Sequence, residues 1–383
     1  MLPYSNPTPQ ALLVGRVWIP DVGPALVRVD GEQVIDITSK SLPTMQALLE
    51  SEDLVKTVRQ AKGSELCSLS QLSENSLRDD REQLIHLLAP ADLPAIKASG
   101  VTFAESMVER VIEEQAAGDA DRAEAIRARV KSVIGDSLSG IKPGSEQAMQ
   151  VKSVLQQEGL WSQYLEVGIG PDAEVFTKCQ PMSAVGFGAD VGIHPISTWN
   201  NPEPEIVLAM NSRAEIVGAT LGNDVNLRDV EGRSALLLGK AKDNNASCAI
   251  GPFIRLFDAE FTLDSIRKAD LSMRVEGVDG FELDGFSSMT KISRDPASIV
   301  VQTIGRHHQY PDGFLLFLGT MFAPVKDRDA AGQGFTHHTD DIVKIMEPNL
   351  GELCNRVRYS TECPEWTFGT SALIRNLAKR QLL

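Results

Sequence analysis

The sequence predicts an α+β fold that is mostly β, with a small N-terminal domain and a helical insert. Apolar residues alternate in short stretches over residues 11–37, as they do in strands. A charged stretch at about 103–158 has helical periodicity, and after residue 170 short apolar runs are separated by glycine and proline. We therefore expect a β-rich N-terminal domain over residues 1–88 and a larger domain over residues 89–383 that carries the insert.

The composition is that of a globular protein with a sizeable core. Hydrophobic residues make up 42% of the 383 positions and charged residues 23%. The net charge of −15 repels phosphate backbones, so we expect no nucleic-acid partner.

We expect a cytoplasmic protein with no membrane partner. The first ten residues lack the basic and apolar regions of a secretion signal. The longest apolar run, residues 313–324, is too short to cross a bilayer and is expected to be a buried strand. The five cysteines include no Cys-x-x-Cys pair, which argues against a disulfide framework and against a structural zinc site.

The N-terminal domain is expected to be a small β unit with helical cover. Residues 11–18 and 24–30 alternate like strands, and Asp30-Gly31 marks a tight turn into a third strand. Residues 43–62 have helical periodicity. His86 lies in an apolar stretch and is interpreted as a packed strand residue rather than a ligand.

The insert begins where a strand near residue 98 runs into a helix through Arg110. This helix is charged on most faces and is expected to continue to about Lys131, before Lys142-Pro-Gly144 breaks the pattern. A second helix is expected over residues 145–158. The insert could be a lid, an interface element or a plain solvated helical hairpin, and the sequence leaves these three open.

A short strand after the insert carries the first polar candidates. Residues 174–178 alternate so that Glu174, Phe176 and Lys178 face one side. Lys178 could neutralise an acidic substrate, or it could be an ordinary surface lysine.

A hairpin at residues 203–224 carries the acidic candidates. Glu203 and Glu205 are two positions apart at the start of one strand, so both face the same side. The returning strand ends at Asp224, which can meet them at the same end of the hairpin. Three carboxylates on two rigid strands suit a hard divalent cation, and Lys242 is a natural cationic partner. The alternative is a solvated strand face followed by an ordinary Asn-Asp turn.

The C-terminal third is expected to be β-rich with a terminal helix at about 371–381. Residues 298–304 fit either a helix or a strand. Thr320 places a hydroxyl at the tip of the apolar run and could anchor a carboxylate. The adjacent pairs His307-His308 and His337-His338 point to opposite sides of an extended chain, so we expect one substrate-facing or structural histidine in each.

Several common catalytic motifs are absent from the sequence. It has no dinucleotide fingerprint, no Walker sequence, no His-Glu-x-x-His and no Gly-x-Ser-x-Gly.

An ordered set of short motifs resembles the fumarylacetoacetate hydrolase superfamily over about residues 86–360: Glu203-Pro-Glu205, Asn223-Asp224, Arg228-Asp229, Lys242 and Gly251-Pro252. The resemblance implies a β-roll catalytic domain and a metal ion, usually Mg²⁺ and possibly Mn²⁺, held by Glu203, Glu205 and Asp224. It also implies a functional lysine at Lys242. Lys240 is the rival assignment, since it would share a strand face with Lys242.

The resemblance is to the sugar-acid branch of the superfamily. Hydrolases and decarboxylases of the family carry a histidine and, three residues later, a glutamate in the lid, whereas this chain has Ser106 and Glu109. The implied reaction belongs to oxidative pentose breakdown. It is the dehydration of 2-keto-3-deoxy-D-xylonate or D-arabinonate to α-ketoglutarate semialdehyde through a metal-stabilised enolate.

The residue pattern and the family resemblance together give the full set of expected site residues. Lys242, Glu174 and the lid residue Glu109 are expected to act in catalysis, and the substrate is expected to contact Lys178, Ser106, Thr320 and Phe103. Family members are commonly homodimers or homotetramers, so we expect a homo-oligomer. Two alternatives stay open: a C–C bond hydrolase or decarboxylase of a 2,4-diketo acid, and a non-catalytic sugar-acid binding protein.

Overall fold

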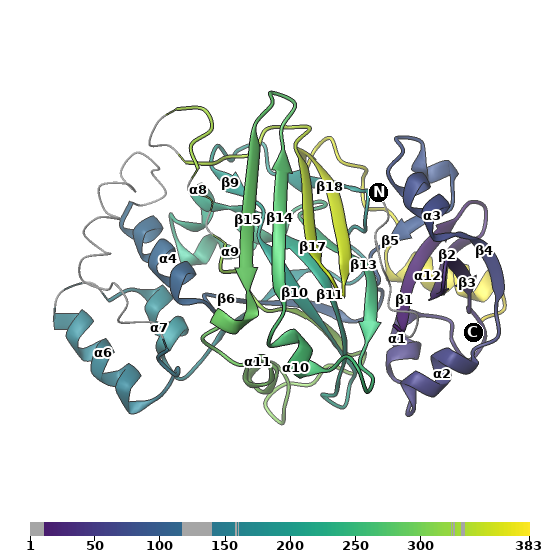
Figure 1. Cartoon of the computed structure of the whole chain (residues 1–383), viewed down its shortest axis with the longest axis horizontal. Coiled ribbons are helices and arrows are strands. Elements are labelled where there is room, and N and C mark those ends of the chain that lie inside the picture. Colours follow the sequence, from purple (N-terminus) through teal and green to yellow (C-terminus); the bar gives the residue numbers. More distant parts are fainter. Residues whose placement is uncertain are drawn as a thin grey trace.

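The computed structural model describes residues 11–116 and 140–383, except residues 158, 160, 323, 325 and 331–333. The first ten residues and the expected helical continuation to Lys131 lie outside the described residues. Three regions follow one another in Figure 1: a helical region, a central body of two packed sheets, and a small unit from the N-terminal residues. The expected α+β fold that is mostly β is confirmed.

The largest sheet runs through the central body into the N-terminal unit. Among the described residues it has eleven strands. Ten of them lie side by side in the order β4 (Ser64–Ser68), β3 (Gln33–Asp36), β2 (Gly23–Asp30), β1 (Leu13–Ile19), β13 (Cys248–Leu256), β11 (Ile216–Asp224), β10 (Pro204–Met210), β16 (Phe314–Phe317), β6 (Ala95–Gly100) and β7 (Glu174–Cys179). The eleventh, β5 (His86–Leu88), pairs with β1.

A second sheet covers the middle of the first. Its order is β15 (Glu282–Ser288), β14 (Asp270–Glu276), β17 (Ile342–Glu347), β18 (Gly351–Tyr359) and β8 (Asp190–Ile193). Strands β14, β17 and β18 pack on β10, β11 and β13, and the main hydrophobic core lies between them. A two-stranded ribbon of β9 (Asn200–Asn201) and β12 (Asn226–Leu227) completes the central body.

Strands β10 and β13 are buried along their whole length because both of their faces are covered. One face meets the second sheet, and Ala209, Ile254 and Leu256 on the other face pack against helices of the N-terminal unit. Two-sided burial explains why these strands read as continuous apolar runs. The expected hairpin of β10 and β11 is present as an antiparallel pair.

The N-terminal unit has the expected strands and helical cover. The helical periodicity over residues 43–62 forms two short helices rather than one, because Thr44 caps the first and Asp53 caps the second. The helices are α1 (Met45–Leu49), α2 (Leu54–Gln60) and α3 (Leu69–Ser76). His86 is buried in β5, as expected of a packed strand residue.

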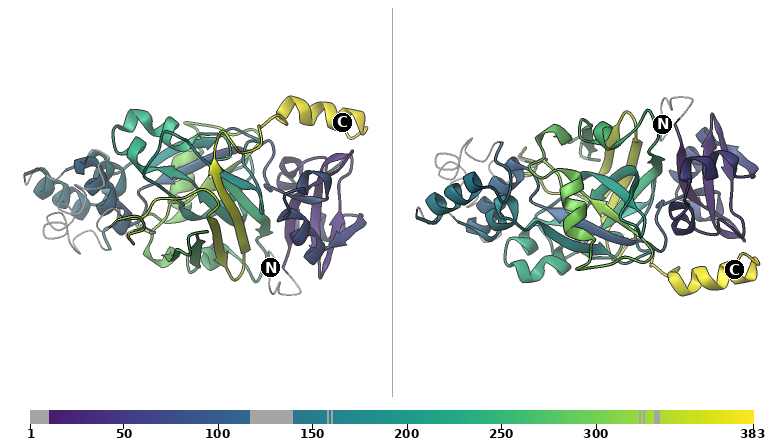
Figure 2. Two further views of the ribbon diagram at one scale, coloured as in Figure 1. Left: turned by 90° about the horizontal axis from the view of Figure 1, so that it is seen from above. Right: turned by 90° about the horizontal axis from the view of Figure 1, so that it is seen from below.

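The division of the chain at residue 88 remains a prediction. Strand β1 pairs with β13 in the register Leu13↔Arg255, so the two predicted domains share one sheet. The terminal helix α12 (Thr370–Lys379) lies beside the N-terminal unit rather than on the central body (Figure 2). Asn376 Nδ2 donates to Val22 O at 2.7 Å, and the Arg380 guanidinium donates to Pro24 O at 2.6 Å.

The helical region has a small core of its own. Within the described residues its helices are α4 (Ala104–Ala116), α6 (Glu146–Gln157) and α7 (Gln163–Ile169). Met107, Val111, Leu155 and Leu165 meet in a cluster that is separate from the main core. Helix α6 confirms the second expected helix. Helix α7 was not predicted; Ser162 caps its start, and Gly168 lies in its last turn.

The remaining α-helices of the part of the chain that the structure describes are short: α8 (Arg228–Glu231), α9 (Leu238–Lys242), α10 (Leu263–Ile266) and α11 (Pro296–Thr303). The sequence left residues 298–304 as helix or strand, and the structure has a helix that Asp295 caps and Pro296 starts. All five cysteines are free and buried. No helix within the described ranges combines the length and hydropathy that a membrane crossing requires.

Candidate active site

Strand register brings the three expected carboxylates together. Pro204 is paired with Asn223 across β10 and β11, so Glu203 and Asp224, one step further, lie opposite each other. The Asp224 N–H donates to Glu203 O at 3.1 Å, which fixes this end of the hairpin. Glu205 lies two residues into β10 and faces the same side. One oxygen from each of the three lies within 4.8 Å of the others, and all three side chains are buried.

Two lysines contact Asp224, one at each oxygen of its carboxylate. Lys242 Nζ lies 3.1 Å from Asp224 Oδ2 and 2.6 Å from Glu203 Oε2. Lys178 Nζ lies 2.9 Å from Asp224 Oδ1 and also donates to the backbone carbonyl of Lys242. Burial opposes ionisation of Asp224, but the two ammonium groups hold its pKa below the usual value. Burial alone would lower the pKa of Lys242, and Asp224 and Glu203 raise it instead.

Glu205 lies in a different environment from Asp224. Its Oε2 accepts a hydrogen bond of 2.6 Å from the Gly319 N–H. Burial, together with the charges of Asp224 and Glu203, raises the pKa of Glu205 well above its usual value. Gly319 has φ +85°, and a Cβ there would lie 2.1 Å from Thr102 Oγ1, so only glycine brings this N–H to Glu205 without strain.

The triad fits a hard divalent cation. Carboxylate oxygens are the ligands that Mg²⁺ and Mn²⁺ prefer, and three of them leave positions open for water or substrate. The raised pKa values of Glu203 and Glu205 show that burial leaves the acidic cluster short of positive charge. A bound cation would supply that charge. The residues that could hold a divalent metal ion are therefore Glu203, Glu205 and Asp224.

We expect the Glu205→Gln protein to separate metal binding from stability. Glutamine keeps an oxygen that can accept from Gly319, but it removes a carboxyl group whose ionisation burial opposes. The melting temperature of the metal-free protein should stay unchanged or rise by roughly 2–4 °C. The rise in melting temperature that Mg²⁺ or Mn²⁺ causes should be lost. Differential scanning calorimetry with and without metal checks both, and a clear fall in the metal-free value would contradict this account.

Glu174 starts β7 opposite Gly100, at the end of β6. Burial raises its pKa to about 7, and the Glu231 carboxylate adds to that effect. A carboxyl group whose pKa is close to neutral is suited to proton transfer at physiological pH. Of the other two residues on the expected face of this strand, Phe176 lines the cavity, whereas Lys178 lies behind Asp224.

A cavity over the triad gathers most of the expected site. Its lining residues are Ser99, Gly100, Val101, Ser106, Arg110, Glu174, Phe176, Glu203, Glu205, Asp224, Glu231, Lys242, Gly319 and Thr320. The metal candidates, Lys242, Glu174, Ser106 and Thr320 are therefore together. The Ser106 hydroxyl also donates to Phe103 O at 2.9 Å within its own helix.

Three expected site residues lie elsewhere. Phe103 is fully buried in the main core, because it precedes α4 and its backbone bridges to Ile292. Glu109 Oε2 lies 3.9 Å from the Arg228 guanidinium, and Glu109 is not among the residues that line the cavity. Lys178 is completely buried behind Asp224, so it contacts the carboxylate rather than a substrate. None of the three is among the residues that line the cavity, so the catalytic role of Glu109 and the substrate contacts of Phe103 and Lys178 stay predictions.

The structure also distinguishes the two lysine candidates. The sequence suggested that Lys240 and Lys242 share a strand face, but both lie on helix α9. Residues two apart on a helix point to different sides. Lys242 is buried against the triad, whereas Lys240 is exposed.

Two charged residues that line the cavity were not among the predicted site residues. Arg110 of α4 donates to Glu203 Oε1 and to Glu231 Oε2, each at 2.7 Å. Glu231 ends α8, seven residues after Asp224. The Arg228-Asp229 motif beside Glu231 is the one signal that could have drawn attention to α8, while Arg110 is one charge among many on its helix.

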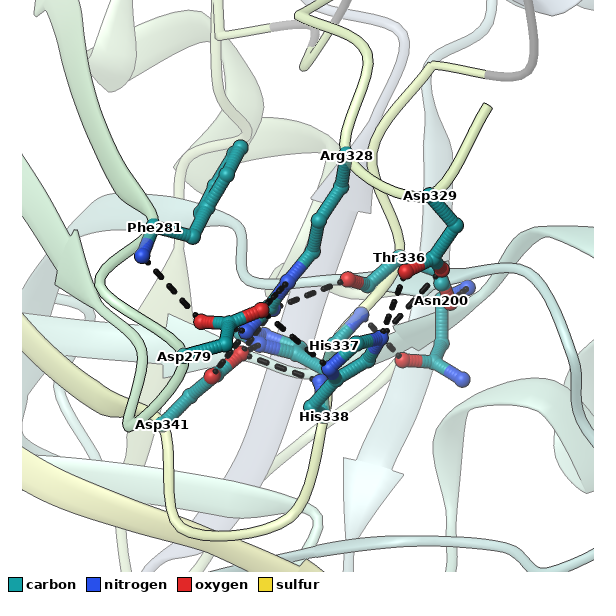
Figure 3. Close-up of polar contacts among 9 residues, drawn as sticks. All are labelled: Asn200, Asp279, Phe281, Arg328, Asp329, Thr336, His337, His338 and Asp341. Carbon is teal, nitrogen blue, oxygen red and sulfur yellow. Dashed lines mark hydrogen bonds and ion pairs between the residues drawn. The ribbon is translucent and has the colours of Figure 1, made fainter.

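One histidine pair contributes a structural residue. His337 is buried, and its Nδ1 lies 3.0 Å from Asp341 Oδ2, which also binds Arg328 at 2.7 Å (Figure 3). The His337 N–H donates to Asn200 Oδ1 at 3.2 Å, and Asn200 lies three residues before Glu203. This cluster therefore anchors the chain that leads into the triad. His307 and His308 are both exposed, so the first pair lies away from the cavity.

Comparison with protein families and curated proteins gives consistent matches. Residues 170–358 match the model described as fumarylacetoacetate (FAA) hydrolase C-terminal. The chain is 29% identical over 188 residues to a 2-dehydro-3-deoxy-D-arabinonate dehydratase of Saccharolobus solfataricus, which is 48% of this chain and 58% of the relative. It is 30% identical over 213 residues to a probable 2-keto-3-deoxyxylonate dehydratase of Haloferax volcanii, which is 56% of this chain and 68% of the relative.

The fold is also found among solved structures. A structure described as 2-keto-3-deoxy-D-arabinonate dehydratase complexed with magnesium and 2,5-dioxopentanoate aligns with a TM-score of 0.62 at 21% identity. The alignment covers 91% of this chain and 99% of that one. This likeness confirms the expected β-roll architecture.

Proposed function

The chain belongs to the fumarylacetoacetate hydrolase family, and from that premise we propose that it is a metal-dependent dehydratase of 2-keto-3-deoxy sugar acids. The proposed substrate is 2-keto-3-deoxy-D-xylonate or D-arabinonate, and the proposed product is α-ketoglutarate semialdehyde. The observation that carries the proposal is the buried triad of Glu203, Glu205 and Asp224, with Glu174 and Lys242 on the same cavity. The names of both curated relatives support the substrate class.

The resident ion is proposed to be Mg²⁺, with Mn²⁺ as a substitute. The structural relative described with magnesium and 2,5-dioxopentanoate supports this choice, and 2,5-dioxopentanoate is another name for α-ketoglutarate semialdehyde. When bound, the ion supplies Lewis-acid polarisation of the α-keto acid, which makes the C3 hydrogen more acidic.

The residues of the chain then carry the proton transfers. Glu203 and Asp224 keep Lys242 protonated, so Lys242 is not the base, and we assign it the role of proton donor to the leaving hydroxyl. Glu174, whose pKa is about 7, is suited to remove the C3 proton. Lys242 protonates the departing C4 hydroxyl as the C4–O bond breaks, and water leaves. As the double bond moves to C4–C5, C5 loses a proton and C3 regains one, and the resulting enol tautomerises to the C5 aldehyde.

The pH dependence of the rate tests the role of Glu174. A base must be deprotonated, so kcat/KM should rise with pH through a midpoint at or below about 7, since a bound cation draws the pKa down. The Glu174→Gln protein should lose this inflection, and its kcat should fall by about 10²–10⁴-fold. The measurement is a rate profile between about pH 5 and 8. A rate that falls with rising pH over this range would make Glu174 the acid instead.

Product analysis tests the proposed reaction. We expect incubation with 2-keto-3-deoxy-D-xylonate and Mg²⁺ to yield an aldehyde, and chelation of the metal to abolish it. A C–C bond hydrolase acting on a 2,4-diketo acid would instead release pyruvate or a similar fragment. A melting-temperature shift with sugar acid but no turnover, with or without Mg²⁺, would indicate a binding protein. The homodimer or homotetramer remains a prediction, which light scattering can test.

A further inference from the structure

The cavity contains an ion pair that the proposed chemistry does not use. Arg110 Nη1 lies 2.7 Å from Glu231 Oε2, and both residues line the cavity over the triad. Their side chains are largely buried, at 13% and 6% exposure. Arg110 also binds Glu203 at 2.7 Å, so it fixes Glu231 relative to the triad.

The position of Glu231 follows from the local fold. Strand β12 begins two residues after Asp224, and the single turn of α8 then brings the chain back to the cavity. The charge of Glu231 acts on both Glu174 and Lys242. Glu231 lines the same cavity as Glu174 and Lys242, the groups that we propose for proton transfer.

The C5 end of the proposed sugar-acid substrate carries a hydroxyl group for which the residues assigned above provide no partner. A cation held by Glu203, Glu205 and Asp224 would polarise the α-keto acid end of the substrate, and Lys242 would serve the C4 hydroxyl. The C5 hydroxyl needs partners of its own. A hydroxyl offers one donor and two acceptor lone pairs, and leaving it unsatisfied in a closed cavity is unfavourable. A carboxylate held beside a guanidinium offers the complementary acceptor and donor.

The cavity wall contains a second group that indicates a polar ligand. Ser99 Oγ, near the end of β6, is buried and has no hydrogen-bond partner among the described residues. Buried hydroxyls are nearly always satisfied, so an unsatisfied one in a cavity wall indicates a ligand atom or a water molecule.

We propose that Glu231, positioned by Arg110, binds the terminal hydroxyl of the substrate and makes the site selective for sugar acids over keto acids that lack this hydroxyl. This inference rests on the proposed function and specifies its substrate class. With an analogue that lacks the C5 hydroxyl, the Glu231 carboxylate stays buried without this hydrogen-bond partner. That costs more binding free energy than the loss of a contact alone.

The test compares two substrates that differ in one hydroxyl. The wild-type protein, Glu231→Gln and Glu231→Leu are assayed on 2-keto-3-deoxypentonate and on 4-hydroxy-2-oxopentanoate, which lacks the C5 hydroxyl. The wild type should prefer the pentonate in kcat/KM by at least about 10²-fold. Both variants should lose about 10–10²-fold on the pentonate, with at least tenfold less loss on the analogue. The exposed Glu215→Gln provides the matched control and should keep both values.

Calorimetric binding of both compounds with Mg²⁺ is measured alongside, so the two claims can fail separately. If the wild type converts neither compound, the proposed function is overturned, and the ratio of dissociation constants still decides the role of Glu231. An Arg110→Lys protein should keep more of the preference than Arg110→Met does. Equal losses on both compounds, or a wild type without preference, would overturn the inference and leave Glu231 as a structural partner of Arg110.

Discussion

Replacing Asp224 with asparagine is expected to abolish metal binding and to lower the stability of the metal-free protein at the same time. Asp224 forms ion pairs with two lysines, at 2.9 Å from Lys178 and 3.1 Å from Lys242, and both lysines are buried. Breaking a buried ion pair typically costs about 3–5 kcal/mol, because the remaining charge stays buried without its partner. We expect kcat to fall by at least about 10²-fold, as one of the three ligands becomes neutral.

The stability effect distinguishes Asp224 from its neighbour Glu205. The Asp224 carboxylate compensates two cations, whereas the hydrogen bond to Glu205 comes from the Gly319 backbone. The Asp224→Asn protein should therefore melt several degrees lower than the wild type without metal, while Glu205→Gln should not. Asp284→Asn, at an exposed position of β15, provides the matched control and should keep both the melting temperature and the metal-induced shift. Equal melting temperatures for Asp224→Asn and wild type would contradict the two-lysine arrangement.

The lowered pKa of Asp224 also predicts how the stability of the protein changes with pH. Its pKa in the folded protein is lower than in the unfolded chain, so the unfolded chain binds more protons at acidic pH. Its contribution is complete above the unfolded value of about 4 and is lost as the pH falls through the folded value. In the wild type, the loss of stability in acid should therefore exceed that of Asp224→Asn.

The hairpin and its carboxylates could be predicted because both depend on local rules. Alternation along a strand places Glu203 and Glu205 on one side, and a short turn between two apolar runs brings Asp224 back opposite them. The predicted positions of these carboxylates hold in the folded protein because β10 and β11 are hydrogen-bonded to each other as an antiparallel pair. The same local reasoning placed Glu174 correctly at the start of β7.

Residues that depend on helix phase or on long-range packing were harder to predict. The adjacent residues Glu109 and Arg110 of α4 point in different directions, and it is Arg110 that contacts the triad. The charged pattern of this helix does not predict which of its faces is turned toward the triad. Phe103 was expected at the substrate, but it lies in the main core, and its backbone, just before α4, bridges to Ile292. Lys178 was expected at the substrate, but it is buried and contacts Asp224. Strand alternation predicts the face of the sheet on which a side chain lies, but not how deeply it is buried.

Replacing Lys242 with methionine is expected to stop turnover while leaving metal binding intact. Methionine keeps much of the length of the side chain but removes the ammonium group that lies 2.6 Å from Glu203 and 3.1 Å from Asp224. That ammonium group competes electrostatically with a cation for the same carboxylates, so its loss should leave metal affinity equal or higher. Loss of the proposed proton donor should lower kcat by about 10²–10⁴-fold.

The neighbouring lysine provides the control for this experiment. Lys240 is two residues earlier on the same short helix but is exposed, so Lys240→Met should retain full turnover. Metal affinity is measured by calorimetry on both variants, and turnover by aldehyde formation from 2-keto-3-deoxy-D-xylonate. Normal turnover by Lys242→Met with metal bound would remove Lys242 from the proton transfers. Glu174 would then have to act at both C3 and C4, because it is the cavity residue whose pKa of about 7 allows it to accept a proton and return it.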